Sequence, residues 1–160
     1  MTKASSSFSC DAPPAAVLAT LSDIDFLAAS IPGVVKVEKL DERTALWTVH
    51  ARVGFLERTS VFRGEIVHSS DHDVQFRATG AEATVDGQLD VARLGADRSQ
   101  VSISLDLRGE GPLGPIVEAV MGRRLSSDVQ DLGRKVQERV RLSRADASNS
   151  VRSGAAGAQR

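Results

Sequence analysis

The chain has 160 residues, of which 41% are hydrophobic and 26% charged, and its formal net charge is −1. These values are ordinary for one soluble globular domain, and the balanced charge excludes the large basic surface typical of nucleic-acid-binding proteins. No run approaches the roughly 18 apolar residues that a membrane-spanning helix needs, and residues 1–10 lack the apolar segment of a secretory signal.

Cysteine and aromatic residues are scarce. Cys10 is the only cysteine, so an internal disulfide is impossible and a reducing, cytoplasmic compartment is indicated. The chain has five Phe, one Trp and no Tyr. The interior is therefore expected to consist mainly of aliphatic side chains and glycine, a composition that permits an internal cavity without demonstrating one.

The first 33 residues predict one strand, two short helices and a turn. Residues 3–11 alternate weakly between polar and apolar positions, as a strand does. Asp11, followed by two prolines, is typical of a helix start, and Asp23 of a second one. The second helix is expected to end before Pro32, which lacks a backbone donor. Gly33 can adopt a positive φ, so the Pro32-Gly33 pair turns this helix into a strand.

Residues 34–109 repeat with a period of two. The clearest alternation runs over residues 101–108, in which valine, isoleucine and leucine alternate with serine, aspartate and arginine. Consecutive strands with one apolar and one polar face, joined by short turns, predict an antiparallel meander. We expect about six strands here, and their apolar face needs a cover.

Residues 113–141 are expected to supply that cover. Apolar residues recur there every three or four positions, which predicts one long amphipathic helix. After Leu142 the only large apolar residue is Val151, a composition typical of disorder. The predicted organisation is a single α+β domain over residues 1–142 and a disordered tail over residues 143–160.

Residues 109–114 match G-x-G-x-x-G, the glycine pattern of a dinucleotide-binding loop. Such a site also needs a second parallel strand after the helix, whereas this helix leads into the tail. Pro112 further removes a backbone donor that could hold a phosphate. We therefore interpret the glycines as the turn that folds the long helix back onto the sheet, and we expect no cofactor.

No residue is placed for catalysis or metal binding. His68 and His72 lie across a predicted turn rather than on one helix face, and His50 is expected on the polar face of a strand. A structural metal site needs about four ligands, so we predict three surface histidines. Carboxylates fall on polar faces or at helix caps, and Cys10 on the polar side of the first strand. A register error of one residue would, however, turn His50 or Glu65 inward.

The long predicted helix is rich in basic residues between positions 121 and 144. Two interpretations remain open: contact with an anionic membrane surface or an acidic partner, and the ordinary solvated face of an amphipathic helix, which is the more common case. The basic residues are Arg123, Arg124, Arg134, Lys135, Arg139, Arg141 and Arg144, and the acidic ones are Asp128, Asp131 and Glu138.

Three stretches resemble a known family. They are residues 21–34 (LSDIDFLAASIPGV), 52–66 (RVGFLERTSVFRGEI) and 107–114 (LRGEGPLG). With the order of elements, they resemble the helix-grip fold of the START-like (SRPBCC) superfamily, which includes polyketide cyclases and lipid-transfer domains. Within it the chain is most similar to the CoxG-like family of carbon monoxide dehydrogenase accessory proteins, above all in its Ile-Pro-Gly-Val motif at residues 31–34.

This resemblance implies a curved sheet that grips the last helix, with an apolar cavity between them. The turn after the second short helix is expected to shape the mouth of the cavity, at Ile31, Pro32 and Gly33. The candidate ligand-binding side chains come from the apolar face of the sheet (Trp47, Val49, Phe62, Ile66, Phe76, Leu89, Ile103 and Leu105) and from the helix (Ile116, Val120, Met121 and Leu125).

Three functions remain open. The resemblance favours a non-catalytic protein that binds a lipid or quinone-like molecule and serves a molybdenum hydroxylase such as carbon monoxide dehydrogenase. Some relatives carry a hydrophobic C-terminal extension that is not seen here, so at most peripheral contact with the inner face of the membrane is expected. The second function is a cyclase or dehydratase that uses the same cavity and needs an inward polar or titratable group. The third is a protein-interaction module with a filled core.

Overall fold

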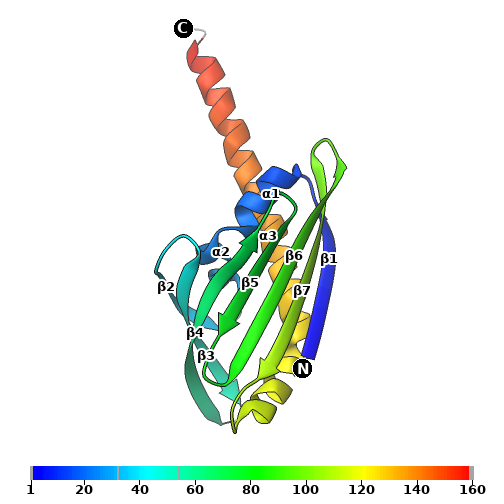
Figure 1. Ribbon diagram of the computed structural model, residues 1–160. Coiled ribbons are helices and arrows are strands. Elements are labelled where there is room, and N and C mark those ends of the chain that lie inside the picture. The colour runs from blue at the N-terminus through cyan, green and yellow to red at the C-terminus, as the bar shows by residue number, and fades with distance from the viewer. Residues whose placement is uncertain (1, 32, 54, 159–160) are drawn as a thin grey trace.

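The computed structural model describes residues 2–31, 33–53 and 55–158, and the side chains of these residues except 53, 56 and 147–158. Within them, one curved antiparallel sheet packs against a long C-terminal helix and two short helices (Figure 1). The predicted order of strand, two short helices, six further strands and long helix is confirmed. The fold is the α+β helix grip expected from the sequence.

The strands and helices have the following bounds. The strands are β1 (Thr2–Cys10), β2 (Val34–Lys39), β3 (Thr44–Val53), β4 (Leu56–Ser69), β5 (Asp73–Thr79), β6 (Ala83–Gly95) and β7 (Arg98–Gly109). The helices are α1 (Pro14–Leu21), α2 (Ile24–Ser30) and α3 (Gly114–Ala158).

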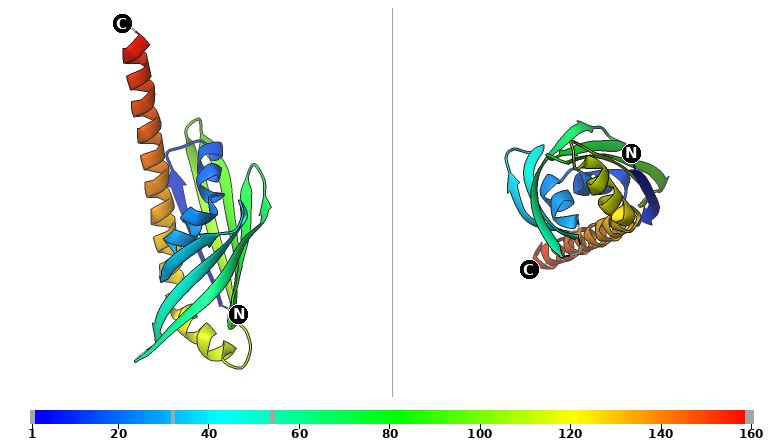
Figure 2. Two further views of the ribbon diagram at one scale, coloured as in Figure 1. Left: turned by 90° about the vertical axis from the view of Figure 1, so that its left-hand side faces the viewer. Right: turned by 90° about the horizontal axis from the view of Figure 1, so that it is seen from below.

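The two short helices connect opposite edges of the sheet. The strand order is β1-β7-β6-β5-β4-β3-β2, and all neighbours are antiparallel. α1 and α2 carry the chain from β1 at one edge to β2 at the other, and the meander then returns strand by strand to β1. The sheet curves around the helices, and α3 lies across the open side of the curve (Figure 2).

The predicted apolar face of the sheet is its concave face. Ile103, Leu105 and Leu107 on β7 are buried, whereas Ser104 and Arg108 between and beside them are exposed. The same alternation holds on β4, where Phe62 is buried. Side chains alternate between the two faces of a strand, and paired residues on adjacent strands point to the same face. Once the buried positions of one strand are known, the pairing therefore gives the buried positions of the next strand.

The two short helices have different N-caps. At α2, one Asp23 carboxylate oxygen accepts from the backbone N–H groups of Asp25 and Phe26, as predicted for a cap. At α1 the prediction was wrong in detail, since Pro13 occupies the N-cap without a side-chain cap and Asp11 does not take that role.

The turn after α2 is built on Gly33. Its φ is +89°, in the left-handed region, and its carbonyl accepts from the backbone N–H of His50 at 2.8 Å. A Cβ at this position would lie 3.0 Å from the carbonyl oxygen of His50. Glycine therefore lets the chain leave α2 and join β3 within one turn.

α3 packs against β1 and β7 through a stripe of apolar side chains. The buried members are Leu125, Val129, Leu132, Val136 and Val140. Two glycines in the helix lie against β1, Gly122 beside Thr2 and Gly133 beside the Phe8 ring, so that the helix backbone approaches the strand closely.

The helix is longer than the sequence predicted. α3 continues to Ala158, through residues that were expected to form a disordered tail after a helix ending at about position 141. Residues 143–153 contain neither proline nor glycine, so a helix that has already begun can extend through them, and Gly154 and Gly157 lower the helix propensity only in the last turns. The last turns extend beyond the sheet (Figure 1).

The glycine pattern at residues 109–114 forms a turn between β7 and α3. Gly109 and Gly114 lie so close that a Cβ on Gly109 would overlap the Gly114 backbone, and Gly111 has a φ of +70°. The backbone N–H of Gly109 donates to the carboxylate of Glu118 at 3.2 Å. The pattern serves a tight reversal of the chain, which agrees with the interpretation made from the sequence.

Candidate functional site

The predicted sheet residues come together on the concave face. Trp47, Phe62, Ile66, Phe76, Leu89, Ile103 and Leu105 are buried there, and Val49 is half-buried. These residues lie on strands β3 to β7. The pairing of each strand with its neighbour places their side chains on the same face of the sheet. The arrangement forms one apolar surface, while its role as a ligand site remains a prediction.

Three aromatic rings lie over glycines, of which two are in strands and the third, Gly80, is in the turn between β5 and β6. The Trp47 ring covers Gly64, the Phe76 ring covers Gly87, and the Phe62 ring covers Gly80, each occupying the space that a Cβ would need. Trp47 and Phe76 are in contact, with ring centroids 6.4 Å apart and planes tilted by 54°. We call Trp47, Phe62 and Phe76 the aromatic layer. Rings packed on strand glycines in this way protect the backbone and fix the register.

The burial of the predicted helix residues depends on their position along α3. Leu125 is buried, and Val120 and Met121 are half-buried. Ile116, in the first turns, is 62% exposed and does not join the apolar core. The helical periodicity placed it on the apolar side, but it lies in the first turns of α3, which are at the opposite end of the sheet from α1 and α2 (left view of Figure 2).

One end of the concave face is less covered than the other. In the left view of Figure 2, α1 and α2 lie over the upper part of the sheet, and the first turns of α3 lie at its lower end. Val49, Val85, Val117 and Met121 pack against the core and remain partly exposed. The expected mouth residues Ile31, half-buried, and Gly33, exposed, lie beside β3, whereas Pro32 lies outside the described residues.

Trp47 carries an unusual polar group for such a surface. The residue is 2% exposed, and its indole Nε1 is buried without a hydrogen-bond partner among the described residues. An unpaired buried donor costs about 1–3 kcal/mol. The sequence marked Trp47 as an apolar lining residue, and periodicity cannot reveal that its N–H has no partner.

The hollows found at the surface lie elsewhere. One of about 210 Å³ is lined by Ser9, Cys10, Asp11, Gln137, Val140, Arg141 and Arg144, and one of about 190 Å³ by Ser6, Phe8, Gln130, Gly133, Arg134 and Gln137. Both follow the seam between β1 and α3, and neither includes a predicted lining residue. Each is smaller than the roughly 300 Å³ at which drug-sized sites begin, and their rims are polar and charged.

The alternation predicted for β3 and β4 is correct, so neither His50 nor Glu65 turns inward. His50 and Glu65 are both exposed on the outer face, where His50 Nδ1 lies 3.2 Å from the Thr59 hydroxyl. Cys10, expected on the polar side of its strand, is instead buried and faces the core. Burial, with the nearby Asp11 carboxylate, raises the pKa of its thiol to about 11. Cys10 is therefore protonated near neutral pH and is not a nucleophile.

Asp128 is one of three half-buried carboxylates in the described part of α3, with Glu118 and Asp131. Burial raises its pKa, and the positive charges of Arg124 and Lys135 act in the opposite direction. A carboxyl group with a raised pKa is a feature that general acids share, although structural groups show it as well.

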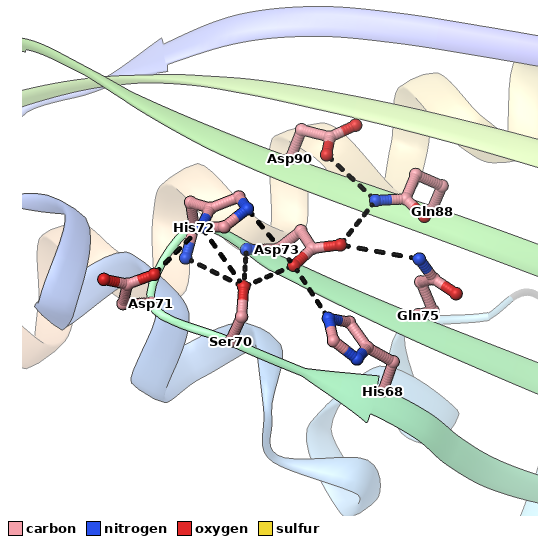
Figure 3. A network of polar contacts seen from close by, with 8 residues as sticks. All are labelled: His68, Ser70, Asp71, His72, Asp73, Gln75, Gln88 and Asp90. Carbon is pink, nitrogen blue, oxygen red and sulfur yellow. Dashed lines mark hydrogen bonds and ion pairs between the residues drawn. The ribbon is translucent and has the colours of Figure 1, made fainter.

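A polar network occupies the outer face of the sheet at the turn between β4 and β5 (Figure 3). Asp73, with its side chain 10% exposed, accepts hydrogen bonds from the Ser70 hydroxyl and from Gln88 Nε2 at 3.1 Å. His68 Nε2 lies 3.2 Å from the same carboxylate. The hydrogen bonds from Ser70 and then Gln88 lower the pKa of Asp73 to about 2.

The network stabilises the turn between β4 and β5. Ser70 closes it, because its backbone N–H donates to the Asp73 carbonyl at 2.9 Å and its hydroxyl accepts from the Asp73 N–H at 3.1 Å. His68 and His72 are exposed, as predicted, with side chains 51% and 73% accessible. Among the described side chains, no group of three or more His, Cys, Asp or Glu is placed to hold a metal ion.

Basic side chains of α3 have partners within the molecule. Arg134 pairs with Asp131, Arg141 with Glu138 and Arg144 with Asp97, Lys135 donates to the carbonyl of Ser30, and Arg139 lies over the Phe26 ring. These contacts agree with the solvated face of an amphipathic helix. No helix among the described residues is long and apolar enough to cross a membrane.

Solved structures with this fold come from several bacteria. A conserved protein from Geobacillus kaustophilus has a TM-score of 0.72 at 14% identity, covering 88% of this chain and 96% of its own. A START superfamily protein from Mycobacterium smegmatis has a TM-score of 0.63 at 16% identity, with coverages of 89% and 99%. The Zhui aromatase/cyclase from Streptomyces sp. R1128 has a TM-score of 0.58 at 19% identity, with coverages of 88% and 96%. Likeness at these identities concerns the fold alone.

The sequence itself identifies the family. No curated protein matches the chain. However, residues 1–141 match the model of a family described as polyketide cyclase / dehydrase and lipid transport. The concave apolar face and the long helix packed across it agree with that match. The chain thus belongs to the polyketide cyclase / dehydrase and lipid transport family and has its START-like helix-grip fold.

Proposed function

We propose that this protein binds a hydrophobic small molecule, lipid or quinone-like, between the sheet and α3, and carries it without altering it. The observation that supports this most directly is the chemistry of the concave face, where Trp47, Phe62, Phe76 and their aliphatic neighbours form one apolar surface. On the strands of this face Cys10 is the buried titratable group, and it is neutral. Such a surface suits an uncharged ligand body and offers no reacting group.

The less covered end of the face is the proposed site of ligand access. Val49, Val85, Val117 and Met121 pack against the core and are partly exposed, so some of its apolar surface is already in contact with solvent. The predicted lining residues Ile66, Leu89, Ile103, Leu105, Val120 and Leu125 would extend the site inward. In this proposal the Gly33 turn shapes one side of the mouth, because its backbone is bonded to β3 beside Val49.

The experiment is native mass spectrometry of the protein purified from its own host, followed by organic extraction of the bound material. We expect a bound lipid or quinone whose mass is unchanged after incubation with the protein. A protein that arrives without ligand, and takes up neither lipids nor quinones when these are offered, would refute the carrier. The Gly33→Ala variant, measured for uptake in the same way, tests the mouth.

A cyclase or dehydratase reaction in the same place is the second candidate function. It is supported by the family description and by the half-buried Asp128, whose pKa is raised. The two functions differ in one readout, because an enzyme returns a molecule that has lost water or closed a ring, whereas a carrier returns its ligand intact. The recovered mass therefore separates them.

Service to a molybdenum hydroxylase is the finer part of the proposal. It rests on the resemblance of residues 31–34, Ile-Pro-Gly-Val, and of the segment 52–66 to the CoxG-like family of carbon monoxide dehydrogenase accessory proteins. In this role the protein stays in the cytoplasm, with at most peripheral contact with the membrane. Affinity purification from the native host should recover the components of such an enzyme, and recovery of an unrelated partner would refute this role.

A further inference from the structure

The aromatic layer contains one group that an apolar ligand alone would not use. Ser30 and Ser99, which are also buried, donate to the backbone carbonyls of Phe26 and Ala12 at 2.7 Å each. Trp47 Nε1 is the buried side-chain nitrogen or oxygen left without a partner in the described part of the chain. Native proteins rarely leave a buried donor unpaired without a reason.

The position of the indole is imposed by packing and not by hydrogen bonding. Its six-membered ring lies on Gly64, where any larger residue would displace it, and its centroid lies 6.4 Å from that of the tilted Phe76 ring. Trp47 is paired with Phe62 across β3 and β4. The N–H is thus held at one place on the concave face before any acceptor is present, which is how a preorganised binding group is built.

We propose, on the basis of the function proposed above, that the ligand carries a neutral oxygen acceptor, a carbonyl or hydroxyl oxygen, and that the indole N–H of Trp47 donates to it. The acceptor would complete the only hydrogen bond that the aromatic layer offers, while the rings and aliphatic side chains around it hold the apolar body of the ligand. Trp47 is then the specificity residue of the site.

The surroundings of Trp47 determine that the acceptor is neutral. The strand neighbours of Trp47 are all apolar: Ala45 and Phe62 are buried, and Val37 and Val49 are half-buried. The buried Phe76 ring lies tilted against the indole. Burial of a carboxylate among them would leave a negative charge without a countercharge, whereas a ketone or hydroxyl oxygen needs only one donor. The site should therefore bind ligands that carry a neutral oxygen acceptor more tightly than ligands without one, and it should reject ligands with an ionised group.

The test uses the fact that Trp47 is the only tryptophan of the chain. A ¹⁵N-labelled sample has a single indole cross-peak, which reports on this N–H directly. The probes are fluorene and 9-fluorenone, which share a rigid tricyclic skeleton and differ by a methylene group against a carbonyl, and fluorene-9-carboxylate as the ionised counterpart. We expect 9-fluorenone to bind roughly fivefold to tenfold more tightly than fluorene and to shift the indole proton downfield. Fluorene accepts no conventional hydrogen bond and should not move that proton downfield, and the carboxylate should bind least.

Two variants separate the donor from the ring. Trp47→Phe keeps an aromatic ring next to Gly64 and removes the N–H, so the preference for 9-fluorenone should disappear while the affinity for fluorene stays within about twofold. Phe62→Leu removes a ring and keeps the donor, so it should weaken both probes alike and preserve the preference. If Trp47→Phe does not fold, the cross-peak of the unmodified protein still decides.

The outcomes distinguish this inference from the function on which it rests. Equal affinity for fluorene and 9-fluorenone, with an unmoved indole proton, would overturn the role of Trp47 and leave hydrophobic binding intact. Binding of the carboxylate as tight as that of the ketone would overturn the requirement for neutrality. Failure of all three probes to bind would count against the proposed function itself.

Discussion

The concave and outer faces of the sheet belong to the same strands and are held together by different forces. On the concave face, aromatic rings lie on glycines and aliphatic side chains pack under the helices. On the outer face, charged groups pair across strands, as Arg77 does with Asp86 at 2.7 Å and Asp73 with its donors at the β4–β5 turn. Burial dominates the first face, and exposed charge contributes little per pair to the second. Stability and any ligand chemistry are therefore concentrated on one side of the sheet.

The largest contrast should appear between two adjacent residues of β7. Ile103 is fully buried on the concave face, and Ser104 is exposed on the outer one. Ile103→Ala should lower the free energy of unfolding by about 2–5 kcal/mol, because it removes buried methyl groups and leaves a cavity. Ser104→Ala should stay within about 0.5 kcal/mol of the parent. Urea unfolding of both variants measures the contrast. Equal losses of stability would contradict the conclusion that burial on the concave face dominates the stability of the sheet.

A smaller effect is expected where a ring covers a glycine. Gly87→Ala places a methyl group where the Phe76 ring now lies, and the ring must move. Overpacking of this kind costs about 1–3 kcal/mol. The matched control is Gly95→Ala at the exposed end of β6, where the nearest atom to the new Cβ is 4.0 Å away. Thermal unfolding should separate the two variants, and a Gly87→Ala protein as stable as the control would show that the ring is not fixed by the sheet.

The smallest effect, and the one with a pH signature, belongs to the outer face. The folded state holds the pKa of Asp73 at about 2, below its ordinary value of 3.8, so the carboxylate stabilises the fold at pH values above 3.8 and loses this contribution as the pH falls through 2. Asp73→Asn should therefore be less stable than the parent near neutral pH, and the difference should vanish in strong acid.

Urea unfolding over that pH range measures this effect. Glu38→Gln, which changes an exposed carboxylate on β2, serves as its control. A difference between parent and Asp73→Asn that does not change with pH would show that the network acts through shape rather than charge.

Periodicity alone was enough to predict the faces of β3 to β7, whereas the weak alternation of β1 placed Cys10 on the wrong face. The alternation around Trp47, Phe62 and Ile103 assigned each to the concave face, because the period of two in a half-buried strand is set by the geometry of the backbone. The turn at Pro32-Gly33 was predicted from equally local features, since the restrictions on these two residues depend only on their own backbones. The order of elements followed from these patterns and was confirmed.

Features that depend on partners from other strands could not be predicted in the same way. Gly64 and Gly87 share the alternation of their apolar strand neighbours Phe62 and Leu89, but the rings that cover them come from adjacent strands and depend on the register. The sequence around Asp73 does not reveal its role, because its donor Gln88 lies on β6, fifteen positions away. Ile116 has the correct helical spacing, yet it is exposed because periodicity does not say where the sheet ends.

The strand order leaves the sheet with two unlike edges, and this bears on how the protein behaves at high concentration. β1 is sheltered, because α3 runs along it and Gln137 donates to the carbonyl of Ser9 at 2.9 Å. β2 has no such cover from α3, but it is six residues long, contains an irregularity between Val34 and Lys36, and presents Lys36, Glu38 and Lys39 to solvent. Short, charged and irregular edges resist the addition of a foreign strand, since an incoming chain would have to strip water from those charges. The molecule thereby protects its more open edge against aggregation and fibril growth.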